Sequence, residues 1–145
     1  MRIHPAIFIQ QTLRAYFPNA TWYPLDQAYA TLTLAAWADA HHSFTESMWA
    51  EGLPQWLVEK GDCDDWAWLF RADVIKRNWH QSQSRVPVAF FYLHYVKDSG
   101  VDHAINAALV RDGERLYIAP IEPQPDGGLV QLTPTERASC KLVIG

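Results

Sequence analysis

Apolar residues recur at helical spacing through the first half of the chain. This pattern predicts one helix over residues 5–16 and a second over residues 26–40, with Asp26 as the N-cap of the second. A shorter helical segment is predicted over residues 45–50, before a break at Gly52. The first half of the chain is therefore predicted to be helical.

A third helix is predicted over residues 62–80, in the run DCDDWAWLFRADVIKRNWH. Asp62 is suited to the N-cap position, and Asp65 follows three residues later as in a capping box. Trp66 and Phe70 lie on one face of this helix, but apolar residues cover much of its remaining surface as well. A helix that is apolar on so many sides is expected to be buried at the centre of the fold.

The second half of the chain is rich in β-branched and aromatic residues, which favour strands. Strands are predicted over residues 86–96, 103–110, 115–122, 129–132 and 141–144. Asp112 and Gly113 suit a two-residue turn, so the second and third of these strands are predicted to form a hairpin. Helices followed by an antiparallel sheet indicate an α+β fold.

Length and composition limit the function classes that need to be considered. The chain has 145 residues, 49% of them hydrophobic and 19% charged, which predicts a single domain over residues 1–145. A formal charge of −4 argues against nucleic acid and anionic membranes as partners. No apolar run reaches the roughly 20 residues of a membrane span, and no signal peptide is recognised, so we expect a soluble cytoplasmic protein.

Cys63 and Cys140 are the only cysteines, too few for a disulfide framework. Cys63 falls in the first turn of the third predicted helix, where free backbone N–H groups and the helix dipole favour a thiolate. The neighbouring carboxylates of Asp62, Asp64 and Asp65 oppose this effect. A reactive thiol would therefore need a cationic partner.

The predicted hairpin offers such a partner. If Asp112 and Gly113 form the turn, counting outward along the two strands places His103 opposite Glu122. A helix packed on the same face would bring Cys63 to the imidazole, which predicts a Cys-His-Glu triad. The alternative is that the cysteine is a small packing residue and that the histidine and glutamate form a structural pair.

Three segments resemble papain-like cysteine peptidase domains, in particular the protease domain of the fairy-ring mushroom agglutinin. These segments are GDCDDWA over residues 61–67, HAIN over residues 103–106 and IEPQ over residues 121–124. The chain is more loosely similar to bacterial transglutaminase-like cysteine peptidases. The resemblance implies a papain/transglutaminase-like fold, with the cysteine-bearing helix packed on an antiparallel sheet.

The resemblance also implies roles for individual residues. It makes Cys63 the nucleophile, His103 the general base and Glu122 the residue that orients the imidazole. The supporting and oxyanion-binding positions that it implies are Gln55, Asn106 and Gln124. The agglutinin-type domain is activated by calcium, so Asp64 and Asp65 are candidate calcium ligands, although the chemistry itself requires no cofactor.

These observations lead to one main functional hypothesis and two alternatives. The main hypothesis is a cysteine peptidase or amidase that hydrolyses an amide bond of a peptide or protein through an acyl-enzyme on Cys63. The first alternative is a transglutaminase-type acyl transferase, and the second is a catalytically inactive binding module with the same fold. Trp22 and Trp49 are the best candidates for an exposed tryptophan platform, whereas adjacent His41 and His42 are typical of a polar helix end.

Overall fold

The computed structural model describes residues 2–52, 62–81 and 86–145. In these ranges it has four helices and eight strands. The helices are α1 (Ala6–Tyr16), α2 (Leu34–Ala50), α3 (Cys63–Gln81) and α4 (Pro134–Ser139). The strands are β1 (Arg2–Pro5), β2 (Thr21–Tyr23), β3 (Ala28–Thr31), β4 (Phe90–Val96), β5 (Asp102–Asp112), β6 (Arg115–Glu122), β7 (Gly128–Leu129) and β8 (Leu142–Ile144). The fold is therefore mixed α and β.

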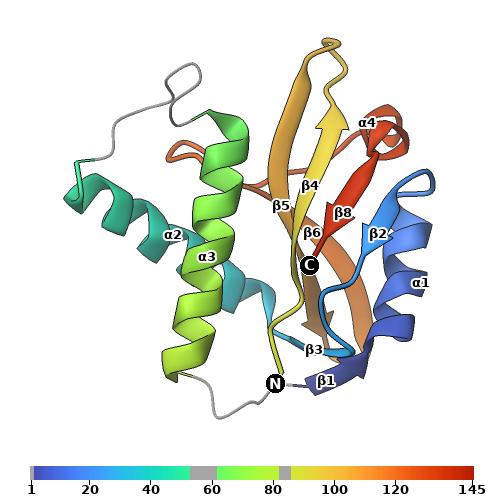
Figure 1. Ribbon diagram of the computed structural model, residues 1–145, viewed down its shortest axis with the longest axis horizontal. Coiled ribbons are helices and arrows are strands. Elements are labelled where there is room, and N and C mark those ends of the chain that lie inside the picture. The colour runs from blue at the N-terminus through green and yellow to red at the C-terminus, as the bar shows by residue number, and fades with distance from the viewer. Residues whose placement is uncertain (1, 53–61, 82–85) are drawn as a thin grey trace.

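The main sheet has six strands in the order β2-β8-β4-β5-β6-β7. β2 and β8 are parallel, and the other neighbouring pairs in this sheet are antiparallel. β1 and β3 form a separate two-stranded antiparallel sheet. As Figure 1 shows, α2 and α3 cover one face of the main sheet, while α1 lies on the other side.

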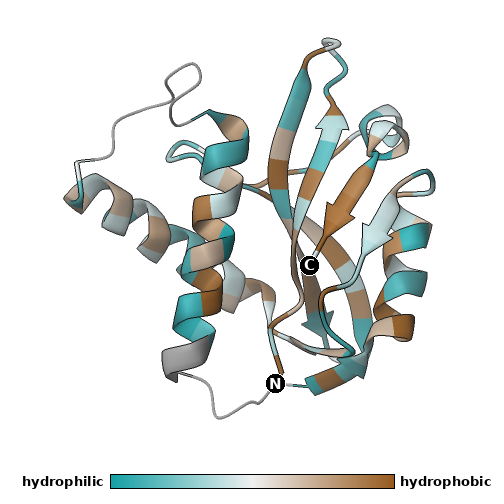
Figure 2. Cartoon of the chain, viewed as in Figure 1, coloured by the Kyte–Doolittle hydropathy of each residue, from teal (hydrophilic) through white to brown (hydrophobic). Residues whose placement is uncertain are grey.

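Alternation along β5 separates the two halves of the core. Ala108 points toward the helical layer, where it packs in one cluster with Trp66 and Phe70 of α3. Ile105 and Leu109 point the other way and pack in a second cluster with residues of α1. Hydrophobic segments accordingly dominate the central strands in Figure 2. Full burial of a large apolar side chain contributes about 1.5–3 kcal/mol, so these two clusters hold both helical layers on the sheet.

Two of the predicted helices are confirmed. α1 begins one residue after the predicted start, and α3 begins at Cys63, directly after Asp62. The expectation that α3 is buried on nearly all sides is wrong, because Trp68, Leu69 and Ile75 are exposed. Only the side of α3 that carries Trp66 and Phe70 is packed into the core.

The predicted start of the second helix is wrong. Residues 28–31 form β3, and α2 starts only after Thr33, whose hydroxyl accepts the N–H of Ala36 at 3.3 Å. The cause is tertiary: the buried Tyr29 hydroxyl accepts the N–H groups of Leu25 and Asp26 at 3.0 and 2.9 Å. These bonds and the pairing of β3 with β1 favour extended backbone where side-chain spacing alone predicted a helix.

The hairpin of β5 and β6 is confirmed, but its register differs from the predicted one. Asp112 pairs with Arg115, so the two turn residues are Gly113 and Glu114. Gly113 has a φ of 57°, a left-handed conformation that glycine adopts without strain. Each residue of β5 therefore pairs two positions further along β6 than predicted, and a shift of two leaves every side chain on its original face.

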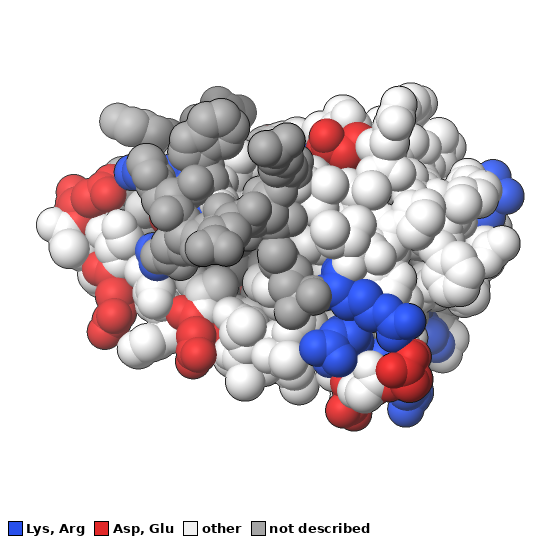
Figure 3. Space-filling model, turned by 90° about the horizontal axis from the view of Figure 1, so that it is seen from below, with Lys and Arg blue, Asp and Glu red and all other residues white. Residues whose placement is uncertain are grey.

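No helix in the described ranges is long and apolar enough to span a membrane. On the face shown in Figure 3, basic side chains gather in one patch with acidic side chains beside it, and further acidic side chains lie away from that patch. Arg2 and Glu114 form an exposed ion pair, at 2.7 Å. Exposed pairs of this kind contribute little to stability.

Candidate functional site at the N-terminus of helix α3

The first turn of α3 positions Cys63. Asp62 precedes the helix, and its Oδ1 accepts the backbone N–H of Asp65 at 3.5 Å, a long hydrogen bond of the N-cap type. The polar sequence DCDD thus starts a helix whose next residues, Trp66 and Ala67, are buried. This arrangement holds Cys63 where the described backbone turns from coil into helix.

The Cys63 thiol is half-buried and packs against Ala104 of β5. Burial raises the pKa of this thiol, and the carboxylates of Asp62 and Asp64 raise it further. The backbone N–H of Ala104 acts in the opposite direction, since it favours the thiolate. The net effect favours the protonated thiol, so the activation expected from the helix dipole does not dominate here.

His103 and Glu122 form the predicted pair. Nε2 of His103 lies 2.6 Å from Oε2 of Glu122, with the two side chains 8% and 17% exposed. The histidine ring also contacts Tyr95 edge to face, with centroids 5.7 Å apart. Because Nε2 is bonded to the carboxylate, Nδ1 is the ring nitrogen left for another partner. In the described part of the chain, no hydrogen bond joins Cys63 to His103.

A tight turn after β6 provides a backbone hydrogen bond to the Glu122 carboxylate. Its second oxygen, Oε1, accepts the backbone N–H of Gln124 at 3.4 Å. The carbonyl of Gln124 in turn accepts the N–H of Gly127 at 2.8 Å. Gln124, predicted as a supporting residue, thus contacts Glu122 through its backbone.

Asn106 is fully buried between α3 and the sheet. Its Nδ2 donates to the carbonyl of Ala67 at 3.0 Å and to that of Phe91 at 3.3 Å. Its Oδ1 is buried without a hydrogen-bond partner among the described residues. Asn106 therefore links α3 to β4 one turn after Cys63. Gln55, the other supporting residue predicted, lies outside the described residues.

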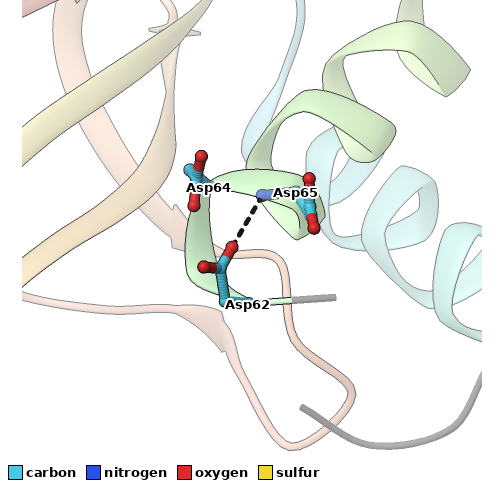
Figure 4. A group of neighbouring side chains, drawn as sticks. All are labelled: Asp62, Asp64 and Asp65. Atoms are coloured by element: carbon cyan, nitrogen blue, oxygen red, sulfur yellow. Dashed lines mark hydrogen bonds between the residues drawn. The ribbon is translucent and has the colours of Figure 1, made fainter. Parts of the chain in front are cut away.

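Three carboxylates surround the start of α3 (Figure 4). Oxygens of Asp62, Asp64 and Asp65 all lie within 4.8 Å of one another. A hydrogen bond between the side chains raises the pKa of Asp64 and lowers that of Asp62, as expected for two carboxyl groups that share a proton. Carboxylate oxygens are donors that calcium prefers, so the donor set fits the ion. Calcium binding at Asp64 and Asp65 stays a prediction.

The sequence reasoning missed an aromatic pair beside this turn. Trp68 is 42% exposed and stacks on Tyr92 of β4, with ring centroids 4.6 Å apart and planes inclined by 10°. Burial raises the pKa of Tyr92 to about 12, and Asp64 and Cys63 add to the shift, so Tyr92 lies near the start of α3. Trp68 is four residues after Asp64 and so lies on the same helix face, a spacing that could have identified it.

The two tryptophans predicted as platform residues lie elsewhere. Trp22 is half-buried and meets Phe91 edge to face, with centroids 6.3 Å apart. Trp49 is 54% exposed and lies near the end of α2. Trp68 lies on the helix that carries Cys63, whereas Trp22 and Trp49 do not.

Solved structures share this fold, among them two complexes. The first, described as the PSL1a–E64 complex, has a TM-score of 0.76 and 21% sequence identity, over 99% of this chain and 51% of that chain. The second, Polyporus squamosus lectin bound to the human-type influenza-binding epitope Neu5Acα2-6Galβ1-4GlcNAc, has a TM-score of 0.73 and 20% identity, over 99% and 49%. This chain thus spans about half the length of each. No protein-family model and no curated protein matches the sequence.

These comparisons correct the predictions drawn from the family resemblance. PSL1a is a Polyporus squamosus lectin, and this finding contradicts the recognition of a papain-like or transglutaminase-like cysteine peptidase. It equally contradicts the predicted cysteine-type hydrolase, and it gives no support to a peptide or protein substrate.

Proposed function

We propose that this chain is a binding module whose ligand site lies at the first turn of α3. The observation that carries the proposal is the buried His103–Glu122 pair, at 2.6 Å, on the strand that packs against the half-exposed Cys63. Burying an imidazole and a carboxyl group is costly unless they are paired, and here the pair occurs at the end of a strand rather than within the apolar core. A role in ligand binding would account for its presence there.

The polar and aromatic groups at the start of α3 define, together with this pair, the chemistry of the ligand. The carboxylates of Asp62 and Asp64 accept hydrogen bonds, and Nδ1 of His103 is a further polar atom. The exposed indole of Trp68 offers a flat apolar surface, held in one orientation by its stack on Tyr92. A few polar groups beside an aromatic face suit a small ligand with several hydroxyl or amide groups and one apolar face.

The structural neighbours support the same class of function. One is a lectin in complex with a sialylated trisaccharide, and the other is a complex with E64. Both ligands belong to those proteins, and this chain corresponds to only about half of each. They are nevertheless the two probes with which the proposal is best tested.

The experiment is isothermal titration calorimetry of the wild-type chain with E64 and, separately, with Neu5Acα2-6Galβ1-4GlcNAc. We expect one of the probes to bind, and we expect His103→Ala and Trp68→Ala each to weaken binding at least tenfold. Trp49→Ala is the matched control, because it removes an exposed tryptophan from α2 and should leave affinity unchanged. If neither probe binds the folded protein, the proposal is wrong.

Intact mass spectrometry, after incubation of the protein with each probe at pH 7, distinguishes reversible binding from covalent reaction. A binding module holds its ligand without a new covalent bond, so the mass of the protein should be unchanged after either probe is removed. A ligand-sized mass increase that is lost in Cys63→Ala would contradict a non-catalytic role.

A further inference from the structure

His41 and His42 are neighbours on α2 with different surroundings. His42 is exposed and forms an ion pair with Glu46 one turn later, at 3.3 Å. His41 is half-buried, and its ring meets Phe70 of α3 edge to face, with centroids 5.7 Å apart. His41 therefore points into the layer between α2, α3 and the sheet, and it is not simply part of a polar helix end.

The ring of His41 also reaches the turn that follows β6. A Cβ placed on Gly128 would lie 3.8 Å from its Nδ1. Burial lowers the pKa of His41, while the backbone of Gln124, Glu122 and Pro123 acts in the opposite direction. Nε2 of His41 is buried without a partner among the described residues.

At the other end of this turn, Gly127 packs closely against Glu122. A Cβ on Gly127 would lie 2.4 Å from the carbonyl oxygen of Glu122 and 2.5 Å from its Cγ, so only glycine fits there. Gln124 and Gly127 close the turn with a 2.8 Å backbone hydrogen bond. Gly127 thus packs directly against Glu122, so a displacement of the turn would also displace the Glu122 side chain.

We propose that His41 is a positioning residue, which holds the turn of residues 122–128 against α2 and so keeps the Glu122 carboxylate on Nε2 of His103. The inference deepens the proposed function, because it rests on the His103–Glu122 pair as a ligand contact. The contact between His103 and Glu122 can be followed in protein to which no ligand is added, so the inference can be tested separately from binding.

The test follows the His103 ring N–H that donates to Glu122, as an exchange-protected downfield signal in 1H–15N spectra of ligand-free protein. We expect this signal in the wild type, its loss in His41→Ala, and its retention in His42→Ala, the matched control. His41→Gln, which restores a side-chain N–H, should recover at least part of the signal. A purely structural role would lower stability without removing the signal from the folded protein.

A second variant keeps the test decisive if His41→Ala fails to fold. His41→Phe preserves the ring on Phe70 but removes both nitrogens, so we expect a folded protein that lacks the signal. An intact His103 signal in folded His41→Ala or His41→Phe would overturn the inference. Loss of the signal without loss of binding to either probe would instead uphold the inference and contradict the proposed ligand site.

Discussion

Gly127→Ala is the substitution for which the structure gives the most definite prediction. The new Cβ would lie 2.4, 2.5 and 2.7 Å from the carbonyl oxygen, Cγ and Cβ of Glu122. Gly127 is not in the left-handed region, so its backbone accepts alanine without strain. The clash with Glu122 therefore decides the outcome.

The magnitude follows from three opposing contributions. Overpacking of this kind costs about 1–3 kcal/mol, and replacing glycine by alanine at a compatible φ returns about 0.4–1 kcal/mol through the unfolded state. If Glu122 moves off His103, a hydrogen bond to a charged group is lost, which costs about 1.5–3 kcal/mol. We expect Gly127→Ala to lower the free energy of unfolding by about 1.5–5.5 kcal/mol.

The assay is urea unfolding followed by tryptophan fluorescence, together with the ring N–H signal of His103. Gly100→Ala is the matched control: its φ of 83° is unfavourable for alanine, but no atom lies within 4 Å of the added Cβ. It should cost about 1 kcal/mol and leave the His103 signal intact. Wild-type stability and an unchanged His103 signal in Gly127→Ala would refute the reasoning.

Three further predictions concern buried and charged groups. Asn106→Ala should lower the free energy of unfolding by about 1–3 kcal/mol in urea, because two buried hydrogen bonds are lost; an unchanged midpoint would contradict the link between α3 and β4. Burial raises the pKa of Cys140 to about 11, so the folded state binds more protons than the unfolded state between pH 9 and 11. The free energy of unfolding should therefore fall by roughly 2–3 kcal/mol over that interval, and less in Cys140→Ala. If calcium binds at the start of α3, millimolar calcium should raise the melting temperature of the wild type but not of Asp64→Asn, whereas an equal rise in both would place the ion elsewhere.

Elements with a strong local signal could be predicted from the sequence. The apolar spacing of α1, the N-cap residues before α3, and the β-branched and aromatic runs of β5 and β6 around Gly113 are such signals, and tertiary contacts reinforce them. β3 could not be predicted in the same way, because the bonds from the backbone to the Tyr29 hydroxyl form only in the folded protein. Chain segments of three or four residues contain too few positions for a period to be recognised.

α4 was missed although its signal is present in the sequence. Thr133 accepts the N–H of Glu136 at 3.1 Å, and Glu136 accepts the N–H of Thr133 at 3.0 Å, a complete capping box with Pro134 in the first turn. The helix has only six residues, none of them buried, so hydrophobic spacing could not reveal it. The capping-box sequence from Thr133 to Glu136 therefore indicates α4, whereas apolar periodicity does not.

The His103–Glu122 contact was predicted through a register that the structure does not have. The observed pairing joins Asn106 to Ile121, so continuing it by one residue puts Glu122 beside Ile105, diagonal to His103. A shift of two residues keeps both side chains on one face, and diagonal neighbours about 7–8 Å apart are within reach of long side chains. Alternation thus predicted which residues share a face, whereas the partner of each residue depended on a turn that begins one residue later. The prediction that α3 packs on the face of Ile105 and Leu109 is wrong, because that face packs against α1 and α3 packs against Ala104 and Ala108. The position of Cys63 relative to His103 lay beyond such counting, because it depends on how α3 packs across the sheet through Ala67 and Asn106.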